Sequence, residues 1–470
     1  MQVVYRRCGG LDVHKDTITA TVLVLGGEGQ REVRKKEFGT HWKELQRLGQ
    51  WLRASKVEQV AMESTGVYWK PVWNVLERSI PLVLANPYQI KNIPWQKTDR
   101  RDSEWIADLL AHGLIRPSFV PVPEIRQLRE LTRYRVQLSG ERNRAHNRIH
   151  KVLEDANIKL DTVLSDLLGA SGRAMLRAIV NGQRDPGWLA DYARGSLRGK
   201  RQQLELVLRG DISYHHRYLL GELLADLEFI ENKIMRLDQE LVDRMQAYQG
   251  SIERLCTIPG IDILTAWTLI AELGGDASAF PDAAHVASWA GLCPGNRESA
   301  GKRLSVRTKK GNRWLRRALC QSAWAVTRKK DCYLTAHFHR RVAQHGTKKA
   351  IIATAHQLLI IAYHLLRDRT VYRELGGNFY DQLHPQRTQN RLIHLHGRLR
   401  AFALHSEVGV DRAPRKFFRA AGTRRHFHCI PPGWNTKAQV QALGVYGFDF
   451  PGPRVSAGHA VASSKTGHAR

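Results

Sequence analysis

Cysteine is scarce in this sequence, and the few cysteines form no metal-binding or disulfide pattern. The six cysteines lie far apart, at positions 8, 256, 293, 320, 332 and 429, and no two of them form a CxxC pair. A disulfide framework and a zinc ribbon are therefore not indicated, and a reducing cytoplasm fits this usage. The histidines at 337, 339 and 345 also lack the two ligand pairs of a structural zinc site, so we predict no metal there.

Long apolar segments are scarce as well. The N-terminal stretch MQVVYRRCGG has no apolar core of the kind found in signal peptides. Residues 350–366 are apolar enough to raise the question of a membrane span, but the segment is short and contains His356, Gln357 and His364. These features favour a buried core helix. We therefore expect a soluble protein without a membrane partner.

Acidic residues are too few to balance the basic ones. Lys and Arg number 73 against 44 Asp and Glu, which gives a formal net charge of +29. The excess runs through most of the chain, and a protein that neutralises phosphates releases their counterions, so a nucleic acid is the expected partner. A length of 470 residues with 43% hydrophobic content is sufficient for two or three folded domains.

The first third of the sequence has the pattern of a mixed α/β sheet. β-Branched and apolar residues predict three strands before residue 40, and apolar periodicity then alternates between helix and strand. This order is typical of a sheet covered by helices. The first strand is predicted in two pieces, at 3–5 and 10–13, and the later strands at 17–25, 31–38, 57–62 and 81–85. The helices are predicted at 42–53 and 69–76.

Four acidic residues stand where such a sheet exposes side chains. Asp12 interrupts the first apolar strand, and Glu63 closes a later buried strand. Asp99 and Asp102 lie three residues apart in the stretch KTDRRD, ahead of a predicted helix at 103–112, so a helical turn would bring them to one face. Each acid alone fits an ordinary turn, loop or helix-start residue. Together, acids from three elements favour a metal site that faces a phosphate.

The middle of the chain predicts two long helices. Residues 125–153 are helical in pattern and rich in arginine, including Arg126, Arg129 and Arg133, with few acidic partners among them. Such a charged run either contacts a nucleic-acid backbone or forms a solvated helix face. Residues 220–241 repeat leucine and isoleucine in heptads, the signature of a coiled coil. The partner of this seam is either the 125–153 helix or a second subunit.

The last third contains two candidate phosphate contacts. The segment TIPGI at 257–261 is typical of a helix-hairpin-helix, in which Gly260 would let backbone amides approach a phosphate; an ordinary Pro-Gly turn is the alternative. Further on, Ser299 lies in a loop of small residues, and cations near it would steady phosphate oxygens. No neighbouring His or Lys is an obvious base for this serine. The flanking cations are Arg297, Lys302 and Arg303, and helices are predicted at 314–328 and 348–366.

Several short motifs carry a family resemblance. They are GLDVHKD at 10–16, ESTGVYW at 63–69, NP at 86–87, KTDRRD at 97–102 and the longer segment at 289–317. Together they resemble the DEDD insertion-sequence transposases, which are described as bridge-RNA-guided recombinases and are relatives of the pilin-gene invertases. The resemblance implies an α/β, RNase H-like (RuvC-like) N-terminal domain, a helical coiled-coil spacer and a mostly α C-terminal transposase domain with a helix-hairpin-helix. It also implies that Asp12, Glu63, Asp99 and Asp102 bind Mg²⁺ and that Ser299 is the nucleophile, with Ser305 as the fallback.

The resemblance sets further expectations for partners and domain limits. The partners would be double-stranded DNA of the element ends and target, a non-coding guide RNA, and further copies of the chain in a dimer or tetramer. The protein would act in the prokaryotic cytoplasm, associated with the nucleoid. The expected domains are 1–115 (catalytic), 116–250 (spacer) and 251–381 (transposase). Residues 382–470 lie beyond the resemblance. We predict that they form a basic, disordered tail, and an altered reading frame is the alternative origin of this segment.

Two other functions use the same residues. In a junction-resolving endonuclease, the acids would activate water and Ser299 would only contact phosphate. In a non-catalytic scaffold that binds nucleic acid, the acids would be structural.

Overall fold

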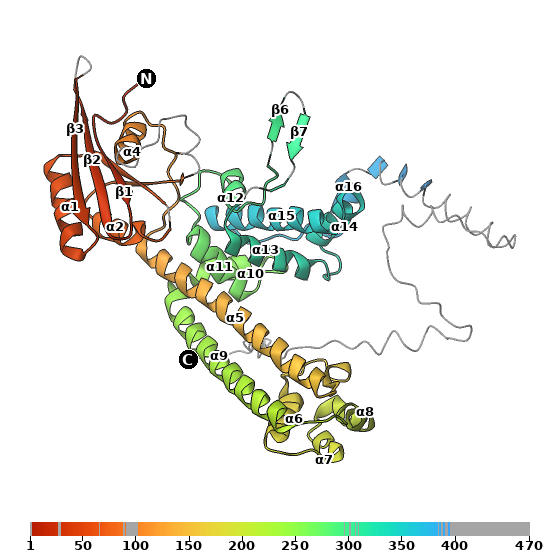
Figure 1. Ribbon diagram of the computed structural model, residues 1–470. Helices are drawn as coiled ribbons and strands as arrows, with labels where there is room; N and C mark the ends of the chain where they lie inside the picture. The colour runs from red at the N-terminus through yellow and green to blue at the C-terminus, as the bar shows by residue number, and fades with distance from the viewer. Residues whose placement is uncertain are drawn as a thin grey trace, which may run out of the picture. The chain divides into compact units, whose positions relative to one another are not determined.

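The structure is a computed structural model, shown in Figure 1, and its described part begins at residue 2 and ends at residue 394. Residues 27–29, 65, 88–89, 91–101, 296, 300–301, 306, 309, 384, 387–388 and 391–392 fall outside the described part, as do 395–470 and the side chains of 297–299 and 302–305. The predictions for Asp99 and for nearly all of the tail therefore lie outside the described residues. The elements below belong to one compact unit, Met1–Ala401.

A five-stranded sheet forms the N-terminal part of the chain. Its strands are β1 (Arg7–Val13), β2 (Thr17–Leu25), β3 (Arg31–Gly39), β4 (Gln59–Glu63) and β5 (Leu82–Ala85), in the spatial order β3-β2-β1-β4-β5. β2 runs antiparallel to both β1 and β3, whereas β4 is parallel to β1 and β5 is parallel to β4. This order and these directions are those of an RNase H-like sheet, so the predicted α/β fold is confirmed.

Helices cover both faces of this sheet. α1 (Trp42–Ala54) and α2 (Trp69–Leu76) pack with Leu11 of β1 on one face. α4 (Asp102–Ala111) packs with Cys8 of β1 and Ala61 of β4 on the other. Successive side chains of a strand point to opposite faces, so the even-numbered residues of β1 face α4. Asp12 therefore lies on the α4 face.

The predicted strand at 3–5 is wrong, because β1 begins only at Arg7 and Val3 and Val4 are exposed. The backbone N–H groups of Val4 and Tyr5 donate to the carbonyl of Ala111 at the end of α4. The segment therefore docks on a helix end instead of joining the sheet, and β-propensity alone does not distinguish these outcomes. The other strands and helices predicted before residue 115 occur within three residues of their expected limits.

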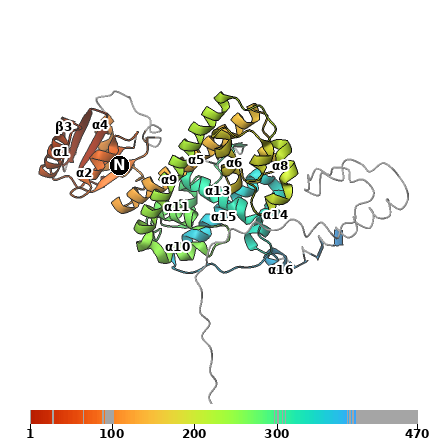
Figure 2. The ribbon, with the colours of Figure 1, turned by 90° about the horizontal axis from the view of Figure 1, so that it is seen from below.

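Two long helices, α5 (Pro123–Asp155) and α9 (Tyr214–Met245), follow the sheet and lie side by side in both views (Figures 1 and 2). They run antiparallel, because Arg135 near the start of α5 pairs with Asp238 near the end of α9, and Asp155 pairs with His216. The leucines of the predicted seam lie in hydrophobic clusters that α5 shares. Of the two predicted partners of the seam, it is therefore α5 of the same chain that packs against it.

A group of short helices joins α5 to α9. It has no counterpart among the sequence predictions. Its elements are a 3-10 turn at Leu160–Thr162, α6 (Ala170–Val180), α7 (Pro186–Ala190), a 3-10 turn at Gly195–Lys200 and α8 (Arg201–Val207). They close a hydrophobic cluster around Leu153, Leu176 and Leu220, at the end of the helix pair.

The C-terminal part is a group of helices with one two-stranded hairpin. Its elements are a 3-10 turn at Gln246–Tyr248, α10 (Gln249–Cys256), α11 (Ile263–Leu273), α12 (Ala283–Trp289), β6 (Arg297–Ser299), β7 (Lys302–Ser305), α13 (Arg313–Val326), α14 (Tyr333–His345), α15 (Thr347–Arg367) and α16 (Phe379–Leu383). Among the described residues, α15 is long and apolar enough to cross a membrane, with a mean hydropathy of 1.4 over its most apolar window. Its apolar residues, including Leu358 and Leu359, are buried in the core of these helices, as predicted for a core helix.

Candidate active site

Three of the four predicted acids lie at one edge of the sheet, on the face that α4 covers. Asp12 is in β1, Glu63 ends β4 and Asp102 begins α4. The parallel strands β1 and β4 pair at Leu11 and Met62, so Asp12 and Glu63 are the next residues in register and point to the same face. In open α/β sheets, sites form at the carboxyl ends of parallel strands, which is where these two acids lie.

A close approach between β1 and α4 brings Asp102 to this edge. A Cβ at Gly10 would lie 2.0 Å from the carbonyl oxygen of Ser103, which is too close for any side chain. The hydroxyl groups of Thr21 and Ser103 also form a buried hydrogen bond of 2.8 Å. The first turn of α4 is therefore held directly against the strands that carry the site.

The neighbouring carboxylates influence the ionisation of Asp12. Burial raises the pKa of Asp12, whose side chain is 16% exposed, and the carboxylates of Asp102 and Glu63 raise it further. His14 acts in the opposite direction, because its Nε2 lies 3.1 Å from Oδ2 of Asp12. A divalent cation stabilises a carboxylate whose charge is disfavoured by burial and by neighbouring acids, and carboxylate oxygens are the ligands that Mg²⁺ prefers. The three described acids therefore offer the type of ligand that binds a divalent cation, but among the described residues their oxygens do not form a group within 4.8 Å of one another. The metal site and the contribution of Asp99 to it stay predictions.

The predicted nucleophile lies on a hairpin and not in an open loop (Figure 1). β6 pairs antiparallel with β7, and Ser299, opposite Lys302, is the last residue of β6. Ser299 therefore lies at the end of β6, with Arg297 on the same strand and Arg303 on β7. The side chains of these residues, and of the fallback Ser305, lie outside the described part.

The root of this hairpin is fixed by close backbone packing and by a buried carboxylate. A Cβ at Gly311 would lie 2.3 Å from the backbone nitrogen of Gly291, so two backbone segments touch there. Asn312 accepts hydrogen bonds from two backbone N–H groups at the start of α13, and its Nδ2 donates to Oε2 of Glu272 at 2.6 Å. Glu272, on α11, is completely buried. The hairpin is therefore anchored through a charge in the core.

The three arginines that were predicted to contact nucleic acid are paired within the chain. Arg126 forms a bidentate pair with Glu77, at 2.6 and 2.9 Å. Arg129 and Arg133 both pair with Glu272, at 3.1 and 2.7 Å. The sequence-based premise that these arginines have few acidic partners is wrong, because other elements of the fold supply the glutamates that pair with them. The nucleic-acid role of these three arginines stays a prediction.

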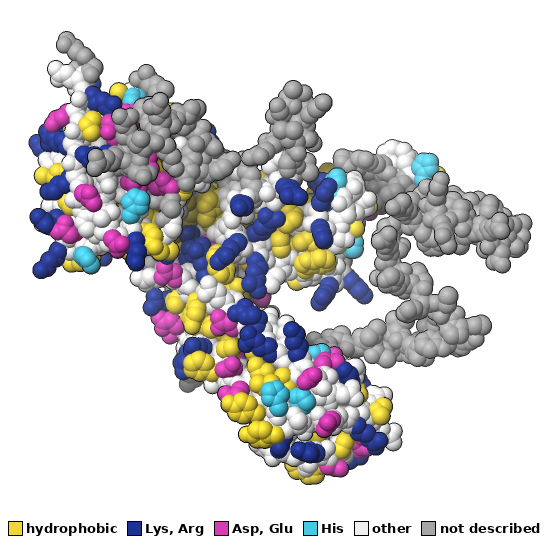
Figure 3. All heavy atoms as spheres, in the orientation of Figure 1, with side chains coloured by type: hydrophobic (Ala, Val, Ile, Leu, Met, Phe, Trp, Pro, Cys, Tyr) yellow, Lys and Arg dark blue, Asp and Glu magenta, His cyan; other side chains and the backbone are white. Residues whose placement is uncertain are grey.

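Other cations, on α5 and α13, line an open groove of about 430 Å³. Arg144, Arg313 and Arg317 contribute charge, and the ring of Trp314 has the Arg313 guanidinium 4.6 Å from its centroid. Figure 3 shows Lys and Arg side chains gathered over the C-terminal helices, with few acidic side chains between them. Cations beside an aromatic wall suit a nucleic-acid strand. The sequence pattern missed this groove because its two helices are far apart in the chain.

Gly260 lies in the turn between α10 and α11, as predicted. Its φ is +84°, and a Cβ would lie 2.7 Å from the carbonyl oxygen of Ser322 and 2.5 Å from the Val326 side chain on α13. The turn and its packing against α13 therefore both require glycine. Asp262 accepts a hydrogen bond from the backbone N–H of Thr265, so a carboxylate already caps α11. The phosphate contact at Gly260 stays a prediction.

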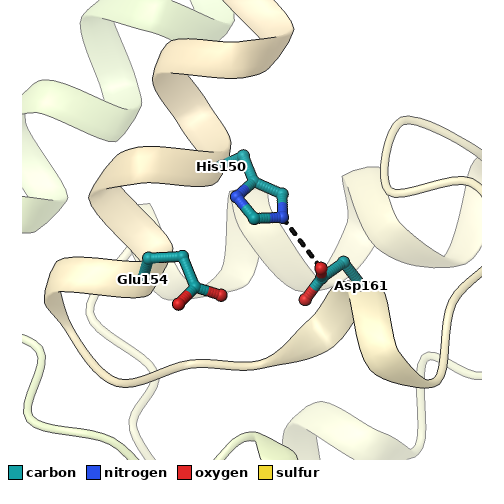
Figure 4. Close-up of side chains that lie close together, drawn as sticks. All are labelled: His150, Glu154 and Asp161. Carbon is teal, nitrogen blue, oxygen red and sulfur yellow. Dashed lines mark hydrogen bonds and ion pairs between the residues drawn. The ribbon is translucent and has the colours of Figure 1, made fainter.

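A separate group of possible cation ligands lies where α5 ends. His150, Glu154 and Asp161 place one ligand atom each within 4.8 Å of one another (Figure 4). His150 hydrogen-bonds Asp161 at 2.9 Å, and Glu154 pairs with Lys159. Exposed groups that already satisfy one another in this way need no metal. We therefore assign them as a surface ion-pair cluster.

The described N-terminal part is an RNase H-like domain with three acids at one edge of its sheet. Two family models match the chain: an IS110-type DEDD model described as a transposase, over residues 9–158, and the transposase family of IS116, IS110 and IS902, over residues 252–340. The chain belongs to this family of insertion-element transposases, whose membership implies DNA cleavage and strand transfer.

Individual relatives agree with this family. The chain is 27% identical over 298 residues to the uncharacterized 43.6 kDa protein of insertion element IS110 from Streptomyces coelicolor, covering 59% of this chain and 72% of that protein. It is 28% identical over 169 residues to the uncharacterized 42 kDa protein of IS900 from Mycobacterium paratuberculosis, covering 33% and 42%. A RuvC structure from Thermus thermophilus aligns with 16% identity, a TM-score of 0.19, and coverage of 24% of this chain and 99% of that one. The fold assignment rests on strand order and direction alone.

Proposed function

We propose that this transposase cuts DNA at the ends of its insertion element and rejoins it, with Ser299 as the nucleophile and Mg²⁺ held by Asp12, Glu63, Asp99 and Asp102. The observation that carries the proposal is the convergence of acids from β1, β4 and α4 at the carboxyl ends of parallel strands. Burial and the neighbouring acids raise the pKa of Asp12, and carboxylates perturbed in this way are concentrated at functional sites.

The residues of the site have distinct tasks in this proposal. When bound, Mg²⁺ would draw charge from a phosphodiester and stabilise its entering and leaving oxygens. Asp12 and Glu63 bind the cation from the sheet, and Asp102 binds it from the first turn of α4. His14, which hydrogen-bonds Asp12, orients that carboxylate.

The serine step conserves the energy of the cleaved phosphodiester bond, which is then available for rejoining the strand. The Oγ of Ser299 attacks the phosphorus of a DNA phosphodiester, a P–O bond to serine forms, and a P–O bond to deoxyribose breaks. The hydroxyl proton passes to water, and the departing deoxyribose oxygen takes up a proton. The product is a covalent phosphoserine link, which a deoxyribose hydroxyl later attacks to rejoin the strand. No net hydrolysis occurs.

Cations on the hairpin and in the groove hold the nucleic acid in this proposal. They contact phosphates, which positions a strand without reading its sequence. We infer from the family resemblance that an element-encoded guide RNA selects the DNA, and that a dimer or tetramer acts on the nucleoid of a prokaryotic cytoplasm. The contacts are Arg297, Lys302 and Arg303 of the hairpin strands, Arg144, Arg313 and Arg317 of the groove, and the turn at Gly260.

The nucleophile is tested by trapping the covalent link. The chain is incubated with labelled element-end DNA, its guide RNA and Mg²⁺, denatured, and separated by gel electrophoresis. We expect a protein–DNA adduct that Ser299→Ala abolishes and that the matched variant Ser305→Ala retains. An adduct of unchanged yield in Ser299→Ala would refute the assignment.

The rival functions give different products in the same assay. A hydrolytic endonuclease yields free cleaved ends and no adduct, and loses both cleavage and metal binding in Asp102→Asn. A non-catalytic scaffold yields neither product, and Asp102→Asn leaves DNA rearrangement in cells unchanged. The metal site has a readout of its own, since Mn²⁺ binding by calorimetry should weaken at least about tenfold in Asp102→Asn.

A further inference from the structure

A small pocket between α14 and α16 is lined by cationic and polar side chains. Its volume is about 220 Å³, and its lining consists of His337, Arg340, Arg341, Gln344 and Tyr380. The first four recur at three- and four-residue spacing along α14 and so share one helix face, while Tyr380 comes from α16. No acidic residue is among them. The pocket therefore presents concentrated positive charge against one aromatic wall.

The arginines of this pocket differ from those of α5 in their partners. Across the part of the chain that the structure describes, no carboxylate forms an ion pair with Arg340 or Arg341. By contrast, Arg126, Arg129 and Arg133 are all paired with glutamates. Neighbouring like charges repel, and an anion between them relieves the repulsion. The pocket therefore suits a negatively charged ligand.

His337 adds a hydrogen-bonding group with no partner among the described residues. The residue is only 7% exposed, and its Nδ1 makes no hydrogen bond there. A buried polar atom left unpaired destabilises the folded chain, so an atom of this kind in a pocket wall indicates a missing ligand. Burial lowers the pKa of His337 to about 4, so the ring is neutral near pH 7 and offers one N–H donor.

Two tyrosines hold one of the arginines in place. The Arg340 guanidinium lies over the ring of Tyr380, 5.1 Å from its centroid. Tyr333 stacks on Tyr380, with ring centroids 5.6 Å apart and 22° between the planes. A cation fixed on aromatic rings before binding loses less conformational entropy when a ligand arrives. The pocket is thus pre-organised on its Tyr380 side.

We propose that this pocket binds a backbone phosphate of the nucleic acid on which the transposase acts. Arg340 and Arg341 supply charge, and His337 donates its N–H to a phosphate oxygen. Pockets for small ligands usually enclose roughly 300–1,000 Å³. The smaller volume of about 220 Å³ suits one phosphate and its sugar better than a free nucleotide cofactor. The proposal rests on the proposed function for the origin of the strand, which is either the guide RNA or the DNA.

The test compares salt-dependent binding of the full chain to labelled single-stranded RNA, single-stranded DNA and duplex DNA. Losing one phosphate contact in Arg340→Gln/Arg341→Gln should flatten the slope of log K against log salt by about 0.7–0.9, and weaken binding roughly five- to eightfold at about 0.1 M salt. The strand type that shows the loss is the one the pocket binds. Arg201→Gln/Arg244→Gln removes the same charge from exposed ion pairs and should change affinity less than about twofold. An unchanged slope, or an equal loss in this control, overturns the proposal.

The donor is tested separately at His337. Asparagine at this position keeps an N–H near Nδ1, whereas phenylalanine fills the space without a donor. We expect His337→Asn to bind within about twofold of the parent and His337→Phe to weaken as much as the arginine variant, with thermal melting as the folding control. Equal behaviour of the two folded variants overturns the donor role. An unchanged adduct in Ser299→Ala refutes the proposed nucleophile, but the salt slopes still test whether the pocket binds a phosphate. The failure of one proposal is therefore distinguishable from the failure of the other.

Discussion

The buried carboxylate of Glu272 offers the most direct test of how the serine hairpin is anchored. In Glu272→Gln, the charges of Arg129 and Arg133 lose their partner in the core. Removing one partner of a buried ion pair costs about 3–5 kcal/mol. Arg129 keeps two backbone carbonyl acceptors, at 3.1 and 2.9 Å, and Arg133 is already 33% exposed to water, so the lower end applies. We expect a loss of about 3 kcal/mol in the free energy of unfolding, measured by urea titration and calorimetry.

The control for this variant is a glutamate whose ion pair is exposed. Glu240 pairs with Arg244 on α9, with both side chains more than 40% exposed, so Glu240→Gln should cost less than about 1 kcal/mol. Since Asn312 at the hairpin root also bonds Glu272, the Ser299 adduct should form more slowly in Glu272→Gln while Mn²⁺ binding is retained. A cost below about 1 kcal/mol for Glu272→Gln would show that the buried pair contributes no more than a surface one.

Two further predictions concern the helix that carries Asp102 and the pocket histidine. Gly10→Ala should cost at least about 2 kcal/mol and abolish Mn²⁺ binding by calorimetry, because its Cβ would meet the α4 backbone at 2.0 Å. The control Gly9→Ala would meet only side-chain methyls, of Val60 at 3.0 Å and Leu52 at 3.4 Å, and should retain the metal. Retained binding in Gly10→Ala would contradict the geometry. The pKa of His337 is about 4 in the folded chain against 6.5 for an ordinary histidine, so the unfolded chain takes up the proton first as the pH falls. Stability should therefore decline between pH 6.5 and about 4 by roughly 3 kcal/mol more in the parent than in His337→Asn, and parallel stability curves of the two proteins would refute this.

Local periodicity was sufficient to predict the sheet and its helices. Alternating residues in β2 and the apolar stripes of α1 and α2 are properties of short segments, and their limits agree closely with the structure. The acids Asp12 and Glu63 were also accessible from sequence, because strand ends in a parallel sheet meet at one edge. The segment at 3–5 failed because its outcome depends on a helix end more than one hundred residues away, at Ala111.

The ion pairs of α5 show why charge patterns along a sequence do not locate a binding surface. Within α5 the arginines outnumber their acidic neighbours, which favoured a nucleic-acid contact. The fold supplies the missing acids from elsewhere: Glu272 from α11, Glu231 from α9 and Glu77 from the end of α2. Net charge therefore overstates what is available to a partner, because much of it is already compensated inside the chain.

The cations that remain without a carboxylate are more informative than the net charge. In the described residues they include Arg313 and Arg317 of the groove and Arg340 and Arg341 of the pocket, all on helices that follow the Ser299 hairpin. A phosphate that binds one of these unpaired arginines displaces only solvent ions. A phosphate that binds Arg129 or Arg133 would first have to break their buried pair with Glu272. We therefore expect variants on α13 and α14 to change the salt dependence of binding, and variants of Arg129 or Arg133 to change stability first.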